Sequence, residues 1–174
     1  MKKPTDRIWL PEELLDEMTA LANRAHPNET GGVLIGYDAG NGLAIAAITG
    51  PGPRAVHEPD AFIPDYVYQD GEIERIYRES GRCHTYLGDW HSHPDGGATL
   101  SSRDKRTLRR IARHRAARAS APIMGILASD ECRGITIWKC FPRDLRAARF
   151  FARYERMVVI ETKGNRTTLN GISV

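Results

Sequence analysis

Two histidines one residue apart, followed by a glycine-rich stretch, a serine and an aspartate, are the residues of this sequence best suited to chemistry. They lie in GDWHSHPDGGATLSSRD, residues 88–104, which contains His91, His93, Ser101 and Asp104. Two imidazole nitrogens and a carboxylate oxygen form a common catalytic zinc site, in which the fourth position is left for water. Such a site requires that the local structure bring His91, His93 and Asp104 to one point.

The two histidines follow a predicted strand. Residues 84–90, HTYLGDW, have the composition of a strand that continues into the histidines. Because alternate side chains of a strand point to the same face, His91 and His93 would lie side by side. Pro94 ends the strand, since proline has no N–H to donate to a ladder.

Asp104 lies in the first turn of a helix predicted over residues 102–120. Leu108 and Ile111 follow it at i+4 and i+7, which places all three on one helix face, toward the core. The end of the strand and the start of the helix therefore bring the three candidate ligands close together. The alternative is a simple cap, in which Ser101 and Asp104 only stabilise the helix start. The conjunction of two ligands on one strand face with an inward carboxylate favours the metal site.

A hydrolytic zinc site also needs a carboxylate that accepts a proton from water and passes it to the leaving group. Glu29, in NETGGVLIG, is the best candidate because it directly precedes a predicted buried strand at residues 30–37. Its alternative is a surface charge in the turn after the first helix. Spacing alone does not distinguish Glu29 from Glu58 or Glu131.

The combination of ETGGVLIG with HSHP and a downstream LSSRD resembles the JAMM motif of the MPN/JAB zinc metallopeptidases. The resemblance covers roughly residues 7–142. It implies that Zn2+ is held by three residues, that a fourth is general base and then general acid, and that a fifth stabilises the oxyanion. The zinc ligands would be His91, His93 and Asp104. The general base and acid would be Glu29, and the oxyanion would be stabilised by Ser101.

The resemblance also implies an activity, the hydrolysis of an isopeptide or peptide bond after the C-terminal glycine of a ubiquitin-like protein. YLGDWHSHP and GPGPRAVHEPDAFIPD are similar to the compact bacterial branch, some members of which accompany ubiquitin-like conjugation systems in anti-phage defence operons. E1-like or E2-like proteins are therefore expected partners. Two alternatives remain, a peptidase that trims a sulfur-carrier-like or small peptide precursor, and a non-catalytic interaction module. A zinc deaminase is disfavoured because H-x-E and P-C-x-x-C are absent from the sequence.

The alternation of strands and helices predicts an α/β (α+β) single domain, and the resemblance implies a curved mixed sheet flanked by helices. We expect a JAB/MPN-like domain over residues 1–142, and a C-terminal helix and tail over 143–174. The remaining predicted elements are strands at 7–10, 42–50, 121–129 and 134–140, helices from Pro11 to before His26, at 65–79 and at 143–157, and a proline-rich loop at 51–60. The last residues are either a closing strand or a flexible end.

Composition limits the class of protein. The chain of 174 residues is long enough for one domain, and its net charge is +3. Basic residues gather between Arg103 and Arg118, which we interpret as a solvated helix face rather than a nucleic-acid site. Three cysteines without a C-x-x-C pair argue against disulfides. No membrane helix or signal peptide is predicted, so a cytoplasmic protein with no membrane partner is expected.

Overall fold

The computed structural model describes residues 7–128, 134–142 and 152–163 of the chain. In these residues the helices are α1 (Glu12–Ala25), α2 (Tyr66–Glu79), α3 (Ser102–Arg113) and a short 3-10 helix, Arg115–Ala117. The strands are β1 (Arg7–Pro11), β2 (Gly31–Asp38), β3 (Leu43–Ile48), β4 (Val56–Glu58), β5 (Ala61–Ile63), β6 (Thr85–His93), β7 (Ile123–Ala128), β8 (Ile135–Pro142), β9 (Ala152–Arg156) and β10 (Val158–Thr162).

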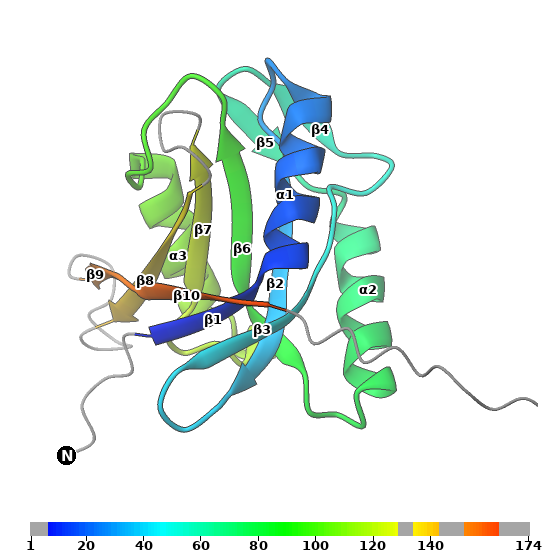
Figure 1. The fold of residues 1–174 in the computed structure, drawn as a ribbon, viewed down its shortest axis with the longest axis vertical. Coiled ribbons are helices and arrows are strands. Elements are labelled where there is room, and N and C mark those ends of the chain that lie inside the picture. The colour runs from blue at the N-terminus through cyan, green and yellow to red at the C-terminus, as the bar shows by residue number, and fades with distance from the viewer. Residues whose placement is uncertain (1–6, 129–133, 143–151, 164–174) are drawn as a thin grey trace, which may run out of the picture.

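One curved mixed sheet forms the centre of the fold (Figure 1). Within the described residues it has eight strands in the order β10-β1-β3-β2-β6-β7-β8-β9, while β4 and β5 form a separate hairpin. Strand β6 runs antiparallel to β2 and parallel to β7, at the centre of the sheet. A central strand has neighbours on both sides, so the histidines at its end are held on a rigid element.

Helices cover both faces of this sheet. Leu15 and Met18 of α1 pack with Leu34 in one buried cluster. Leu108 of α3 packs with Met124 of β7 in a second cluster on the opposite face. Figure 1 shows α1 in front of the sheet and α3 behind it. The predicted curved mixed sheet flanked by helices is therefore confirmed.

Most of the predicted elements are confirmed with shifts of one or two residues at their ends. These are the strands β1, β2, β3, β7 and β8, the helices α1 and α2, and β6, which extends through His93. The last predicted segment includes a closing strand, because β10 pairs in parallel with β1. Residues 164–174 of that segment lie outside the described residues, and the division of the chain at residue 142 stays a prediction.

Three predictions of secondary structure are wrong. The proline-rich loop at 51–60 contains β4, because Val56–Glu58 pairs with Ala61–Ile63. Helix α3 ends at Arg113 rather than near residue 120, since the following residues through Ala116 are exposed and offer no face to bury. The end of the predicted helix at 143–157 is strand β9, which pairs with β8, so sheet pairing overrides its helix propensity. Residues 143–151 lie outside the described residues.

Two further observations concern membrane helices and cysteines. Among the described residues, no helix is long and apolar enough to cross a bilayer. Cys83 is an exposed thiol and Cys140 a buried one, both without a disulfide. Cys132 lies outside the described residues.

Candidate active site

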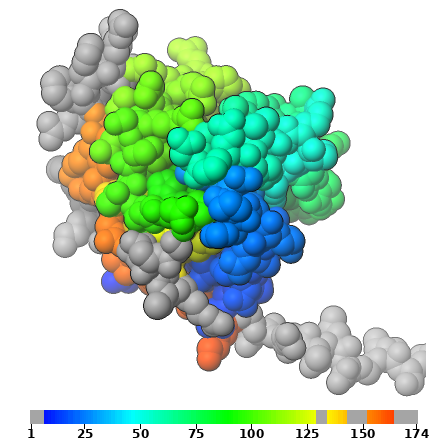
Figure 2. Space-filling view, turned by 90° about the horizontal axis from the view of Figure 1, so that it is seen from above, coloured from blue at the N-terminus to red at the C-terminus, as the bar shows by residue number. Residues whose placement is uncertain are grey.

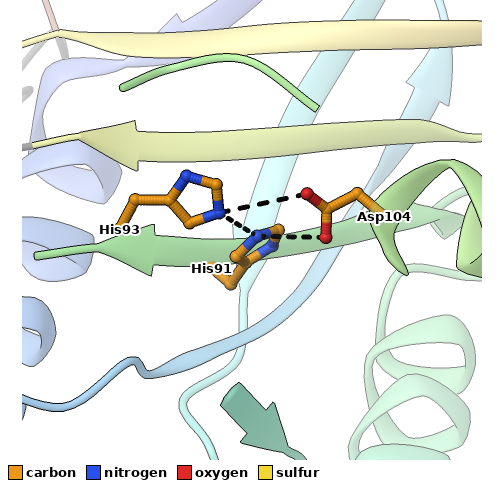
Figure 3. A group of neighbouring side chains, drawn as sticks. All are labelled: His91, His93 and Asp104. Atoms are coloured by element: carbon orange, nitrogen blue, oxygen red, sulfur yellow. Dashed lines mark hydrogen bonds and ion pairs between the residues drawn. The ribbon is translucent and has the colours of Figure 1, made fainter. Parts of the chain in front are cut away.

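The three candidate ligands predicted from the sequence point at one another (Figure 3). Nε2 of His91 lies 2.9 Å from Nε2 of His93 and 3.4 Å from Oδ1 of Asp104. Nε2 of His93 lies 3.9 Å from Oδ2 of Asp104. One ligand atom from each residue falls within 4.8 Å of the others, an arrangement that could hold a metal ion.

The spacing of these atoms fits a zinc ion. Bonds of about 2.0–2.1 Å to tetrahedral corners place neighbouring ligand atoms about 3.3–3.4 Å apart. The 2.9 Å between the two histidine nitrogens and the 3.4 Å between Nε2 of His91 and Oδ1 of Asp104 lie close to that value. The donor set of two imidazole nitrogens and one carboxylate also matches a site that keeps an open position.

The hydrogen bonding of His93 and the pKa of His91 both suit a metal ligand. Nδ1 of His93 lies 2.9 Å from the carbonyl oxygen of Gly97, which can only accept, so Nδ1 is the donor and Nε2 is the nitrogen that faces the other two ligands. Burial lowers the pKa of His91 to about 4, so this ring is neutral at pH 7. A metal binds the neutral form of histidine.

The residue between the histidines fixes the strand end. Ser92 points to the other face of β6, where its Oγ accepts a hydrogen bond from the backbone N–H of Thr30 at 3.0 Å. The backbone N–H of Ser92 in turn donates to the carbonyl oxygen of Thr30 at 2.7 Å. This double contact joins the start of β2 to the end of β6. It brings Glu29, the residue before Thr30, to the histidines.

Asp104 serves as a helix cap and also faces the histidines. Its Oδ2 accepts a 2.7 Å hydrogen bond from the backbone N–H of Ser101, and Oγ of Ser101 accepts one from the backbone N–H of Asp104 at 3.1 Å. The other oxygen, Oδ1, is the one nearest His91. The capping alternative drawn from the sequence is thus correct as a local structure. It does not compete with a ligand role, because the nearest ligand oxygen is outside the cap.

Glu29 lines the same groove as His91 and Asp104. Burial is the main cause that raises the pKa of its carboxyl. A raised pKa brings a carboxyl closer to the value that suits a general base near neutrality. The competitor Glu58 is exposed on β4, while Glu131 lies outside the described residues.

The hairpin β4–β5 holds the backbone of Glu29 from two sides, a contact that the sequence did not reveal. The N–H of Glu29 donates to the carbonyl oxygen of Glu58 at 2.8 Å. Nδ1 of His57 lies 2.9 Å from the carbonyl oxygen of Glu29 and donates to it. Because the segment was predicted to be a loop, no signal in the sequence pointed to this support.

An open groove of about 1050 Å³ extends from these residues between α2 and α3. Its floor includes Val33 of β2 and Asp89 of β6, and its walls carry Ile73 of α2 and Ile111 of α3. Volumes of this size are typical of ligand pockets. In the space-filling view (Figure 2), the cyan-to-teal surface that includes the β4–β5 hairpin borders the green surface of the segment after β6.

The sequence around this site matches a known protein family. Residues 11–141 match the family model described as prokaryotic homologs of the JAB domain. The chain belongs to this family. The matched range includes both histidines, Asp104, Ser101 and Glu29.

Several relatives of this JAB-domain chain carry descriptive names. A probable metalloprotease of Sinorhizobium fredii is 41% identical over 134 residues, 75% of this chain and 79% of the relative. A CD-NTase/cGAS isopeptidase of Vibrio cholerae is 30% identical over 82 residues, 47% of this chain and 53% of the relative. One of Enterobacter hormaechei is 29% identical over 129 residues, 71% of this chain and 68% of the relative. With the family match, they identify this JAB-domain chain as a metallopeptidase.

A solved structure supports the fold. A protein of Desulfitobacterium hafniense has a TM-score of 0.64 and 22% identity to this JAB-domain chain, and the match covers 90% of this chain and 94% of the other.

Proposed function

We propose that the chain is a zinc-dependent isopeptidase or peptidase that hydrolyses the amide bond after the C-terminal glycine of a ubiquitin-like protein. The observation that carries the proposal is the meeting of His91, His93 and Asp104 at one point, beside a groove that Glu29, His91 and Asp104 line. The relatives named isopeptidases support a conjugated protein as substrate. The resemblance to the compact bacterial branch adds a role in antiviral defence to the proposal.

His91, His93 and Asp104 would hold the metal. When bound there, Zn2+ supplies Lewis acidity and lowers the pKa of water to about 7. The chain supplies the rest of the chemistry from Glu29 and Ser101.

Glu29 would move the proton of the reaction. Its carboxylate accepts a proton as water adds to the substrate carbonyl, and returns it to the nitrogen as the C–N bond breaks. The products are a carboxylate and a protonated amine, since both protons of the water end on the departing nitrogen, so atoms and charge balance. The supports from His57 and Glu58 hold the backbone of Glu29 in place for both transfers.

Ser101 would stabilise the negative charge that develops on the carbonyl oxygen. In the cap, its Oγ only accepts from the N–H of Asp104, so its own O–H remains available to donate. Hydrogen bonds to a developing oxyanion are among the larger contributions to catalysis.

A glycine-ending tail suits this site because a residue without Cβ lets its backbone approach a metal closely. The tail would bind in an extended form, adding a strand at an edge of the small β4–β5 sheet beside Glu29. We place the reaction in the cytoplasm, with E1-like and E2-like proteins as partners of the conjugation system. Nucleic acid and membranes have no role in the proposal.

The alternative substrate is a small or sulfur-carrier-like peptide precursor. The relative with 41% identity is named only a probable metalloprotease, which fits either substrate. A non-catalytic interaction module is less well supported, since it would have no use for Glu29 in the groove beside the ligand set.

A Glu29→Gln variant tests the proposal. Glutamine keeps the size of glutamate but cannot accept a proton at neutral pH. The variant should keep zinc and retain conjugates of a glycine-ending protein in its own host, which mass spectrometry would identify. Glu58→Gln, an exposed control on β4, should retain none and keep full activity.

Two outcomes would change the proposal. Full activity in Glu29→Gln would show that another group is the base. An inactive variant that binds zinc but captures no glycine-ending conjugate would favour the small-precursor peptidase.

A further inference from the structure

Polar side chains on β6 lie along the strand next to the metal ligands and extend into the groove. Asp89 precedes His91 by two residues, so both point to the same face of the strand. Opposite Asp89 lie Val33 on β2 and Met124 on β7, both also in the lining of the groove. The carboxyl group therefore lies on the floor, one strand repeat, about 6.6–6.8 Å, from a candidate metal ligand.

A bulge in β6 adds Tyr86 to this row. The register against β2 shifts between Leu34 and Ile35, which pair with Gly88 and Tyr86 and leave Leu87 as the extra residue. The shift turns Tyr86 to the face of Asp89, and its hydroxyl donates a 2.7 Å hydrogen bond to Oδ1. A Cβ at Gly88 would stand 1.8 Å from the carbonyl oxygen of Ile123, so only glycine fits at the bulge.

Among the residues that the structure describes, the Asp89 carboxyl is bound by a hydroxyl group rather than by a cation. Among the described residues, it accepts its hydrogen bond from Tyr86 and forms no ion pair. A carboxylate that loses water when a ligand covers it needs a compensating charge or donor. Cations give the strongest hydrogen bonds to such a group.

We propose that Asp89, contacted by the hydroxyl of Tyr86, provides a substrate subsite for a guanidinium or ammonium side chain near the scissile bond. The proposal rests on the peptidase or isopeptidase function proposed above. An extended peptide advances about 3.3–3.6 Å per residue, so the cationic residue lies within about three residues of the bond. Apolar lining from Val33 and Ile73 would contact the aliphatic stem of such a side chain.

The competing interpretation is that Arg110 is the partner of Asp89. Arg110 is an exposed residue of α3 that lines the same groove, and its charge acts on Asp89. The two residues do not form an ion pair in the structure. If they pair in solution, removal of Arg110 would change the behaviour of the subsite, which a variant can test.

Binding of matched peptides to the metal-free protein tests the subsite without depending on activity. The probes are extended peptides ending in Gly-Gly that carry either arginine or its neutral isostere citrulline at each of the positions before the glycines. We expect the arginine peptide to bind about tenfold or more tightly at one position, and Asp89→Asn to reduce this ratio to about one. Tyr86→Phe leaves the carboxylate in place and should keep the preference, and Arg110→Gln should keep or increase it.

Each outcome decides the proposal. Equal affinity for both peptides in the wild type, or an unchanged ratio in Asp89→Asn, overturns it. Loss of the preference in Arg110→Gln also overturns it, since arginine would then be essential to the site. With zinc added, cleavage of the same sequences carrying a leaving amine joined to the last glycine as an amide reports on the proposed function separately. A binding preference without cleavage would contradict the proposed function and leave the subsite standing.

Discussion

Gly31 on β2 is paired with His91 on β6 so closely that a Cβ at residue 31 would stand 2.2 Å from the carbonyl oxygen of Trp90. The obstacle is backbone, which cannot turn away as a side chain can. The end of β6, and with it the first candidate ligand, can take its position only because residue 31 has no side chain.

Gly31→Ala should therefore move or loosen the end of β6. We expect a loss of about 1–3 kcal/mol in stability and weaker zinc binding, because overpacking forces the backbone apart. Thermal unfolding and zinc titration measure both effects. Gly50→Ala is the control, since a Cβ there meets only Leu21 at 3.5 Å and should change little. Unchanged zinc affinity in Gly31→Ala would mean that the strand end adjusts freely.

Purified protein should bind about one equivalent of zinc through the His91, His93 and Asp104 set. Asp104→Ala should lower the zinc content and also destabilise α3, because the residue is part of the cap. Asp95→Ala, an exposed change in the loop after β6, is the control. Metal analysis after dialysis gives the stoichiometry. A wild type that carries no zinc and gains none on titration would contradict the site assignment.

The metal-free protein should lose a contribution from His91 as the pH falls. The pKa of this histidine is lowered to about 4 in the fold from a usual value of 6.5. A lowered folded pKa stabilises the protein above about pH 6.5, and that contribution is lost as the pH falls toward 4. Urea unfolding of wild type and His91→Asn at several pH values, with chelator present, isolates it. An identical pH dependence in both proteins would show that His91 does not resist protonation.

Ser101→Ala should lower turnover more than it lowers zinc content. Loss of an oxyanion donor costs on the order of a hundredfold or more in rate, and loss of the cap about 1 kcal/mol in stability. Ser102→Ala is the control, an exposed serine next along the chain outside the capping box. Rates should be measured at saturating zinc. Equal rates for the two variants would reduce Ser101 to a helix cap.

The basic face of α3 should not take part in hydrolysis. Arg106 and Arg113 are exposed and lie outside the groove lining. Changing both to glutamate should leave cleavage of a small peptide unchanged. Arg109 is unsuitable for this test because it donates a hydrogen bond to the hydroxyl of Tyr154. Lost peptide cleavage in a variant that is folded and binds zinc would assign the face a catalytic part.

The sequence predicted the parts of the site that depend on local periodicity. His91 and His93 alternate on a strand, and Asp104 shares a helix face with Leu108, so both follow from spacing alone. Glu29 depends on how β2 pairs with β6, a register that no local pattern encodes, and only the family resemblance selected it. Asp89 could have been found from its place two residues before His91.

The missed features depend on tertiary pairing. Tyr86 reaches Asp89 because of a bulge in β6. The glycine at residue 88 indicates that a bulge could occur there but does not determine the register of the strands. His57 supports Glu29 from a hairpin whose three-residue strands are too short to show a period. Strand β9 lies in an arginine- and alanine-rich stretch with helical composition, and its pairing with β8 decides its conformation.

The pairing of β10 with β1 has a consequence for the order of events during synthesis. Residues 158–162 complete an edge that begins at residue 7, whereas every proposed site residue lies between 29 and 104. The strands β2, β6 and β7 that line the groove therefore leave the ribosome before β10, the later of the two partners of β1. Since chains fold from the amino end as they emerge, the ligand cluster can assemble while one border of the sheet is still open.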